Sequence, residues 1–377
     1  MIRQIKKRLL SAAIGFIAIQ LIACSSTGEK PKPTELGAVT NVLAIRQAWS
    51  VPMPAGTANF ELAVVGNEIV AASRDGTVLR MDAATGQVTA RLQAGRSLQA
   101  GVGADANFAA VVDSQNELVL LNRSGAVQWR ARLGSQALAA PVITREAVMV
   151  LTAEQNLLAF DVASGARLWN NQRPAPGLLL NRAGGLALQG DTVLANLAGG
   201  KGAAVSASGT TRWETSFSTA RGANEVERLV DLVGKPAVEG ADVCARSFQS
   251  GIACVAVANG RVRWQRKANG FTGVASDAQF VYGTESNGEV IALARDTGEV
   301  KWTVERFKFR DLSAPVVLGR NLVFGDAQGQ LHILERADGA NAARMSTDGS
   351  AINAPMAIAG QTLVVRTQNA IFGFLPQ

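Results

Sequence analysis

The chain has few of the side chains on which most enzyme chemistry depends. Its 377 residues include one histidine, His332, and three cysteines, Cys24, Cys244 and Cys254. Without a second histidine or a cysteine pair at zinc-site spacing, no ligand set for a catalytic metal is visible. Ser/His/Asp catalysis needs a histidine within reach of substrate, and His332 falls in a predicted strand, where a packed position is expected. The sequence therefore predicts no catalytic residue, no metal and no cofactor.

Strong charge of one sign and a second long apolar run are also missing. The formal net charge is +7, and four basic residues, Arg3, Lys6, Lys7 and Arg8, precede Cys24 without any acidic one. The chain from Cys24 onward therefore carries 33 basic and 30 acidic groups, a net charge of +3. This excess is too weak to indicate binding to nucleic acid.

The N-terminus has the pattern of an export signal. After the basic residues comes an apolar run, Leu9 to Leu21, which is too short to span a bilayer comfortably. The next residues end in Ile22-Ala23-Cys24 and resemble the bacterial lipobox, in which cleavage leaves an acylated cysteine. This resemblance implies a signal peptide over 1–23 and a lipid anchor at Cys24, which three acyl chains would make almost irreversible. The alternative is an ordinary secretory signal with an incidental cysteine.

The residues after Cys24 bear on where the anchor would hold the protein. In lipoproteins of this type an aspartate after the cysteine is typical of retention in the inner membrane, and here that residue is Ser25. The resemblance therefore implies the periplasmic face of the outer membrane. The segment 24–40 is rich in Ser, Pro, Gly and Lys and lacks apolar periodicity, so we expect a flexible tether there.

A turn glycine recurs along the rest of the chain, at spacings of 38 to 51 residues. It stands at Gly86, Gly125, Gly165, Gly209, Gly260, Gly298 and Gly339. Five of these glycines are followed four residues later by a tryptophan, at Trp129, Trp169, Trp213, Trp264 and Trp302. An apolar side chain stands five residues before every one of them, as expected of a core position. Tight-turn pairs such as Asp75-Gly76 indicate hairpins, so each repeat predicts four short antiparallel strands.

Four-stranded units of this period are typical of the blades of a β-propeller, which bury their faces only against neighbouring blades. The 3.6-residue spacing of helical repeats is not seen. Pro355 marks an eighth repeat whose outer strand would fall beyond the chain end, and the segment 41–51, with Trp49, matches that outer strand. We therefore expect an all-β, eight-bladed propeller over residues 41–377, closed by an N-terminal strand that removes an exposed sheet edge.

Two repeat segments, 161–169 and 295–302, resemble those of pyrroloquinoline-quinone-type propellers, a motif that enzymes and non-enzymes share. Together with the lipobox they resemble the BamB family, the lipoproteins of the outer-membrane β-barrel assembly machinery. That resemblance implies a non-catalytic scaffold that binds the periplasmic domains of BamA and the rest of the Bam complex. It also implies help for unfolded outer-membrane proteins, whose extended segments would add to a blade's outer strand.

The segment from Asn224 to Asp231 is similar to the family's acidic-Arg-Leu-x-Asp loop, which contacts BamA. It contains Arg228 and Asp231 and lies in the longest repeat, as an insertion between blades. Loops of this kind are where binding residues concentrate. The family's second aspartate in this loop is replaced by Val233. The alternative interpretation is an arbitrary solvated loop.

The family's second BamA-contacting loop is similar to residues 176–181, in which Leu178 and Leu180 match its two leucines. An arginine follows the second leucine in the family, whereas here Asn181 follows and Arg182 comes one residue later. If the leucines are exposed, they would form the apolar centre of the contact, and Asp231 would pair with a basic group on BamA. The run could equally be a buried strand.

Two further alternatives concern the function and the cysteines. A quinoprotein dehydrogenase holds a quinone and calcium over the propeller's channel, but we find neither a vicinal cysteine pair nor a cluster of metal ligands here. A generic periplasmic propeller that binds a protein or a ligand is the stronger alternative. Cys244 and Cys254 lie on adjacent predicted strands in an oxidising compartment, where they form either a disulfide or two buried thiols.

Overall fold

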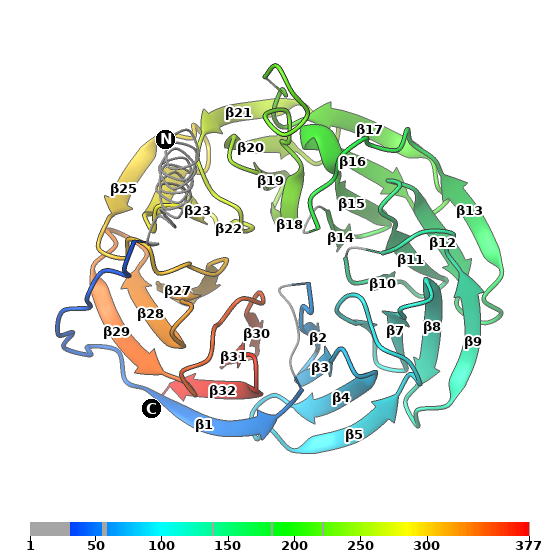
Figure 1. Cartoon of the computed structure of the whole chain (residues 1–377), viewed down its shortest axis with the longest axis horizontal. Helices are drawn as coiled ribbons and strands as arrows, with labels where there is room; N and C mark the ends of the chain where they lie inside the picture. The colour runs from blue at the N-terminus through cyan, green and yellow to red at the C-terminus, as the bar shows by residue number, and fades with distance from the viewer. Residues whose placement is uncertain (1–30, 55–58, 138, 182–183, 221, 377) are drawn as a thin grey trace, which may run out of the picture. The chain divides into compact units, whose positions relative to one another are not determined.

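From Thr34 onward the chain folds into a ring of eight four-stranded antiparallel sheets, the blades of a β-propeller (Figure 1). The computed structural model describes residues 31–54, 59–137, 139–181, 184–220 and 222–376. Cys24 and the predicted signal peptide lie outside these residues, so the anchor stays a prediction. In the described part of the chain, no helix has the length and apolar character to cross a membrane. The predicted fold class is confirmed.

Seven blades are each built from four consecutive strands. The first three contain β2 (Ala63–Val65), β3 (Glu68–Ala72), β4 (Thr77–Asp82) and β5 (Val88–Gln93); β6 (Gly103–Ala104), β7 (Phe108–Val112), β8 (Glu117–Asn122) and β9 (Val127–Arg132); and β10 (Val142–Ile143), β11 (Ala147–Leu151), β12 (Leu157–Asp161) and β13 (Arg167–Asn171). The fourth and fifth contain β14 (Gly185–Gln189), β15 (Thr192–Asn196), the short 3-10 turn η1 (Ala198–Gly200), β16 (Lys201–Ser206) and β17 (Thr211–Ser216); and β18 (Leu232–Glu239), β19 (Asp242–Ser247), β20 (Gly251–Ala256) and β21 (Val262–Lys267). The sixth and seventh contain β22 (Ala275–Ser276), β23 (Phe280–Thr284), β24 (Val290–Ala294) and β25 (Val300–Val304); and β26 (Val316–Leu318), β27 (Asn321–Gly325), β28 (Gln330–Glu335) and β29 (Asn341–Ser346).

The eighth blade joins the two ends of the folded chain. It contains β30 (Ala357–Ala359), β31 (Thr362–Arg366), β32 (Ala370–Pro376) and, as its outer strand, β1 (Ile45–Pro52). Strands β1 and β32 run antiparallel, with Ile45 opposite Pro376 and Pro52 opposite Ala370. Without β1, the edge of β32 would be exposed to solvent. The predicted closure by an N-terminal strand is therefore confirmed.

Six tryptophans seal the boundaries between blades. Each lies on the outer strand of one blade, and its indole N–H donates to a backbone carbonyl of the next blade at 2.7 to 2.9 Å. The ring lies against the turn glycine of that blade, which has φ between 68° and 86°. A Cβ at those glycines would lie 2.5 to 3.0 Å from the ring. Glycine is therefore needed at this position for two reasons: it allows the positive φ of the turn, and it leaves room for the indole ring.

Two boundaries lack the tryptophan and are closed differently. Between the first two blades Ala90 occupies the tryptophan position, and Leu92 packs against Gly125 instead. The fully buried Arg80 lies beside this boundary, 2.8 Å from Glu68, and donates to the carbonyls of Asp105 and Phe108 in the second blade. Polar bonds of a buried arginine thus connect these two blades.

The second such boundary, beside Ala343 of the seventh blade, carries the segment before β1. The backbone N–H groups of Val42 and Leu43 donate to the carbonyl of Ala342, at 2.8 and 3.2 Å. Farther back, the carbonyl of Thr34 accepts from Arg310 at 2.9 Å. The expected tether extended to residue 40, but residues 34–43 lie against the seventh blade, because these bonds and apolar packing hold them there.

Candidate partner-binding site

Two long connections leave the ring beside the third, fourth and fifth blades. One joins β13 to β14 over residues 172–184, and the other joins β17 to β18 over residues 217–231. Because each leads from an outer strand to the inner strand of the next blade, both emerge on the same side of the ring (Figure 1). The N–H of Gly184 donates to the carbonyl of Leu232 at 2.9 Å. The structure therefore brings together the two loops that the sequence singled out.

Asp231 lies at the junction of these loops and is 2% exposed. One carboxylate oxygen accepts the N–H of Leu180 at 2.9 Å, and the other accepts the N–H of Gly199 at 2.8 Å. Its backbone carbonyl accepts from Phe248 at 2.9 Å. A buried carboxylate gains its stability from such bonds, so Asp231 holds three segments of neighbouring blades in place.

This placement corrects the expectation that Asp231 pairs directly with a basic group of a partner. A carboxylate that is buried, with both oxygens already accepting backbone N–H groups, presents no charge to a partner's surface. Its role in this conformation is to position the loop that contains Leu180. A substitution here would act on a partner through the loop, not through a lost contact.

The leucine run belongs to an irregular loop, because β14 begins only at Gly185. Leu178 is 42% exposed, whereas Leu179 and Leu180 are half-buried. Of the two interpretations left open for this run, the structure favours an exposed apolar group at Leu178. Asn181 is also exposed, and its backbone carbonyl accepts from the Asn59 side chain at 2.9 Å. Arg182 lies outside the described residues.

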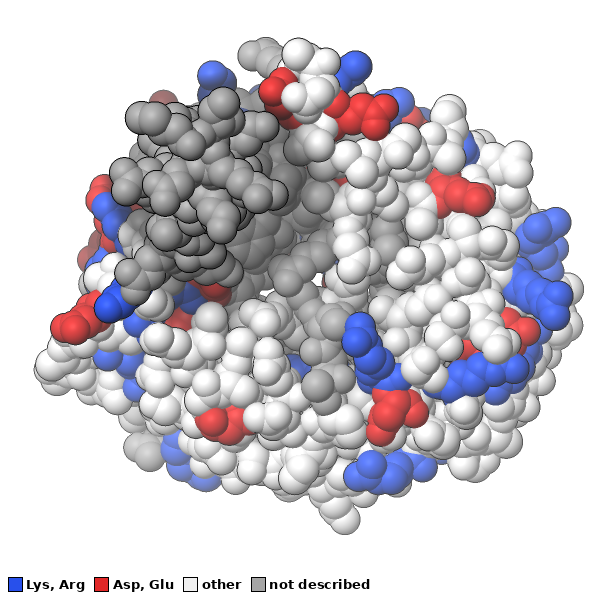
Figure 2. Space-filling view, in the orientation of Figure 1, with Lys and Arg blue, Asp and Glu red and all other residues white. Residues whose placement is uncertain are grey.

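The tip of the second loop is a short helical turn with fixed ends. The Asn224 side chain accepts the N–H of Glu227 at 2.9 Å, and the Glu227 carboxylate accepts the N–H of Ala223 at 2.8 Å. The first of these bonds is an N-cap, which stabilises the first turn of a helix, and the second ties Glu227 to the residue that precedes the cap. Val226 at the tip is 70% exposed, and Arg228 is exposed as well. Acidic side chains gather at the same tip (Figure 2).

One residue that supports this site, Gln155, was not singled out from the sequence. Gln155 has φ +65°, and its side-chain oxygen accepts the N–H of Ala198 at 2.8 Å, beside the bond from Gly199 to Asp231. Gln155 stands ten residues before its turn glycine, where other repeats carry Gly76, Gly288 or Gly329. The glutamine at a position where other repeats carry a turn glycine is the feature of the sequence that could have indicated a special role for Gln155.

The centre of the ring is narrow on the side where these loops lie. A cavity of about 50 Å³ is lined there by Asn59, Glu61, Gly234 and Phe271, among the described residues. This volume is far below the roughly 300 Å³ of the smaller ligand sites in proteins. Lys235 and Glu61, from opposite sides of the ring, pair at 2.7 Å. No group of three or more His, Cys, Asp or Glu side chains in the described part of the chain is placed to hold a metal ion.

His332 is far from the two loops and is packed, as its position in the repeat predicts. It is 2% exposed in β28, stacks against Phe324, and lies 2.9 Å from the fully buried carboxylate of Asp326. Arg310 also donates to Asp326, at 2.7 Å. Burial lowers the pKa of His332, although the Asp326 carboxylate acts in the opposite direction. The histidine therefore stabilises the seventh blade as a neutral side chain.

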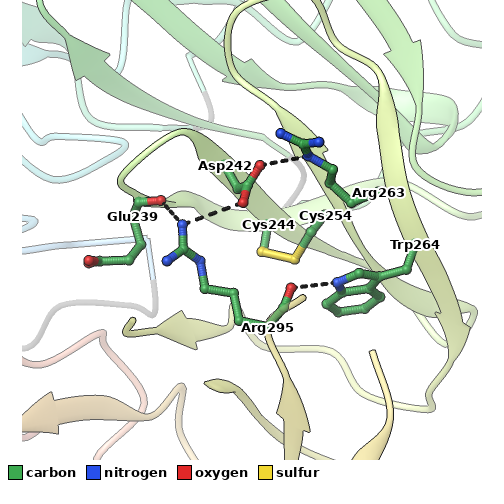
Figure 3. Close-up of a disulfide and its surroundings, with 7 residues drawn as sticks. All are labelled: Glu239, Asp242, Cys244, Cys254, Arg263, Trp264 and Arg295. Carbon is green, nitrogen blue, oxygen red and sulfur yellow. Dashed lines mark hydrogen bonds and ion pairs between the residues drawn. A yellow bond between two sulfur atoms is a disulfide. The ribbon is translucent and has the colours of Figure 1, made fainter. Parts of the chain in front are cut away.

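Cys244 and Cys254 form a disulfide in the fifth blade (Figure 3). They stand directly opposite each other on β19 and β20, with their Cα atoms 4.1 Å apart. The sequence left open whether these cysteines form a disulfide or two buried thiols, and the structure contains the disulfide. Arg295 of the sixth blade donates to the backbone carbonyl of Glu239, which belongs to the fifth-blade sheet that contains the disulfide. The disulfide lies inside the core and forms no part of the two loops.

The comparisons with known proteins point to one family. The family described as "Outer membrane protein assembly factor BamB" matches residues 74–304. Proteins with that name from Bordetella pertussis and Burkholderia pseudomallei are each 35% identical to the chain, over 92% and 99% of it and over 90% and 99% of their own lengths. The crystal structure of BamB from Moraxella catarrhalis has a TM-score of 0.80 at 26% identity, over 88% of this chain and 99% of that one.

A likeness to enzymes is limited to the fold. Quinohemoprotein alcohol dehydrogenase from Comamonas testosteroni has a TM-score of 0.69 at 12% identity, over 89% of this chain and 78% of that one. At such low identity only the propeller architecture is shared, because unrelated functions occur on the same fold.

Proposed function

The chain belongs to the BamB family of outer membrane protein assembly factors, and we propose that it is a non-catalytic scaffold that binds BamA within the Bam complex. The observation that carries this proposal is the pair of loops on the third to fifth blades. Their backbones are fixed by the buried Asp231, while Leu178 and Val226 are exposed beside them. Ordered loops that present apolar side chains are suited to binding a protein partner.

Leu178 is the proposed anchor of the contact with the periplasmic domains of BamA. A few well-packed side chains usually contribute most of the binding free energy of an interface, and a polar rim excludes water around them. Leu180 is half-buried in the same loop and would add apolar area to the contact, and the exposed Asn181 and Arg228 would supply the rim. Arg182, in the same loop, would add a second cation to this rim.

The remaining partners follow from the family and from the sequence. An acylated Cys24 would hold the protein on the periplasmic face of the outer membrane, with a tether between the anchor and Thr34. Unfolded outer-membrane proteins are the proposed clients. Their extended segments would add to an outer strand of a blade, where one row of backbone groups has no strand partner. The rest of the Bam complex would be reached through BamA.

The absence of a catalytic role is part of the proposal. The buried His332 is paired with Asp326, and the cavity at the centre of the ring is small. A generic periplasmic propeller that binds a protein or a ligand is the alternative. It shares the fold but makes no use of the ordered loops around Asp231.

Co-purification from detergent-solubilised envelopes tests this function. We expect the full-length wild-type protein to retain BamA and the double variant Leu178→Ala/Leu180→Ala to lose it. The matched control is Leu168→Ala, because Leu168 is 50% exposed but belongs to the strand β13 and to neither loop. Retention of BamA by all three proteins would keep the role but reject the site. Failure of the wild type to retain BamA would favour the generic propeller.

A further inference from the structure

Residues 59–62, the crossing segment, belong to the connection between β1 and β2 and contact both loop regions across the centre of the ring. The Nδ2 of Asn59 donates to the backbone carbonyl of Asn181 at 2.9 Å. The Glu61 carboxylate lies 2.7 Å from the Nζ of Lys235 in β18. Asn181 belongs to the loop between β13 and β14, and β18 follows the loop after β17. The crossing segment therefore contacts one loop and the strand into which the other loop leads.

The crossing segment is fixed by contacts with the first and eighth blades. Phe60 is 1% exposed, and the guanidinium of Arg366 lies 5.5 Å from the centre of its ring. Arg366 is itself 2% exposed in β31 and donates to the carbonyl of Pro54 at 3.3 Å. The carbonyl of Asn59 accepts the N–H of Gly101 at 2.8 Å. These contacts make the segment an ordered support for the groups that it touches.

An irregularity in β18 places Lys235 at the junction of the two loops. The register between β18 and β19 shifts between Val233 and Ala237, so Lys235 lies outside the regular pairing. Gly234, the residue before it, has φ +70°. Irregularities of this kind change the direction of a side chain and are common next to functional sites. Val233 also forms a bridge with Gly184, at the end of the loop that contains Leu178.

We propose that the crossing segment positions the BamA site, with Asn59 and Glu61 as positioning residues that act through the two loops. Asn59 holds the residue after Leu180, whose N–H is already bonded to Asp231, so the loop is fixed from two sides. Glu61 is 8% exposed, and a buried carboxylate that loses its cation is strongly destabilised. Because β1 leads directly into this connection, closure of the ring and the geometry of the site are coupled. The inference rests on the proposed function, since it concerns the same site.

The test reverses and then swaps the charges of the ion pair in the full-length protein. Glu61→Lys and Lys235→Glu each place like charges together, so each should retain severalfold less BamA from envelopes. Glu61→Lys/Lys235→Glu should retain as much as the wild type. Hydrogen exchange at the Leu180 amide should be about fivefold faster in each single variant and close to the wild-type rate in the swapped one. The matched control is Glu299→Lys, which makes the same charge change at an exposed ion pair with Lys301 and should alter neither measurement.

Asn59→Ala tests the other contact without a change of charge. It removes the donor to the carbonyl of Asn181, so hydrogen exchange at the Leu180 amide should be about threefold faster. BamA retention should fall in the same variant, while the urea midpoint of the ring stays close to that of the wild type. If a single charge variant does not fold, Asn59→Ala decides the proposal by itself.

Three outcomes would overturn the proposal. The first is wild-type hydrogen exchange at Leu180 in every folded variant. The second is faster exchange with full BamA retention. The third is a loss of BamA in the swapped variant as large as in the single ones, which would mean that Glu61 or Lys235 contacts BamA directly. Hydrogen exchange is measured without BamA, so a wild type that retains no BamA would reject the proposed function and leave the effect of the crossing segment on the loops measurable.

Discussion

The boundaries between blades and the loops of the third to fifth blades are held together by different chemistry. At six boundaries a tryptophan at an equivalent repeat position packs on the turn glycine of the next blade, and its indole N–H donates to a backbone carbonyl of that blade. The loops are held instead by bonds that occur once, such as those from Leu180 and Gly199 to the Asp231 carboxylate. The repeated contacts build the ring, and the single contacts shape the surface proposed to bind a partner.

This difference predicts that damage to the ring and damage to the loops have separate consequences. A change at a blade boundary should lower the stability of the whole domain, because propeller blades bury their faces only against their neighbours. A change at the loops should alter local order and binding and leave most of the ring intact. The experiments below test that separation, from the largest expected effect to the smallest.

Deletion of residues 41–51 should have the largest effect. It removes most of β1, so it exposes the edge of β32 and takes Trp49 away from Gly86. We expect the variant to lose the single cooperative unfolding transition in urea and to aggregate. Deletion of residues 26–30, in the expected tether, is the control and should not change the transition. An unchanged urea midpoint in the 41–51 deletion would contradict the closure argument.

Gly298→Ala should lower the free energy of unfolding by about 3 kcal/mol, because it combines a left-handed backbone with overpacking. Gly298 has φ +73°, and a Cβ there would lie 2.6 Å from the ring of Trp264. Gly319→Ala isolates the backbone contribution, since Gly319 has φ +57° and no atom lies within 4 Å of its Cβ position. The control should lose only about 1 kcal/mol in urea unfolding. Equal losses would mean that the tryptophan contact is unimportant.

Asp231→Asn should cost about 1–3 kcal/mol, because an amide nitrogen would face a backbone N–H that now has an acceptor. Hydrogen exchange should become faster at Leu180 or Gly199, while amides of the blade boundaries keep their protection. BamA retention should fall as in the leucine variant. The control is Asp191→Asn, since Asp191 is an exposed residue that pairs with Arg212 and accepts a bond from the Thr192 hydroxyl, away from both loops' backbone N–H groups. Loss of BamA with unchanged exchange at both amides would mean that Asp231 contacts the partner directly.

The prediction from sequence succeeded where the determinants repeat and are close together along the chain. Gly298 and Trp302 are four residues apart, and such pairs, repeated at intervals, predicted the blade, the number of blades and the closure by the segment with Trp49. That each tryptophan seals the following blade was not predicted, because its contact lies a full repeat away. The burial of Asp231 was not predicted either, since its partners are backbone N–H groups, which have no signature in a sequence.

The smallest effect is expected at His332, a buried polar side chain of the ring that has no contact with the loops. Because burial lowers its pKa below the ordinary value of 6.5, the unfolded chain takes up a proton below that pH before the folded chain does. The contribution of His332 is therefore complete above about pH 6.5 and declines as the pH falls toward the folded-state pKa, by at most about 1.4 kcal/mol per pH unit. Urea unfolding at pH 7.5 and pH 5.5 should show this loss.

His332→Leu separates this titration from the rest of the protein, because leucine is the residue that several other repeats carry at the same position. The variant should lose less stability than the wild type between pH 7.5 and pH 5.5, even if the lost bond to Asp326 makes it less stable at both values. BamA retention at pH 7.5 should not change, since the loops are held by other contacts. If the variant loses as much stability as the wild type over this interval, another group titrates there. Protonation of His332 would then make no contribution to the pH dependence of stability.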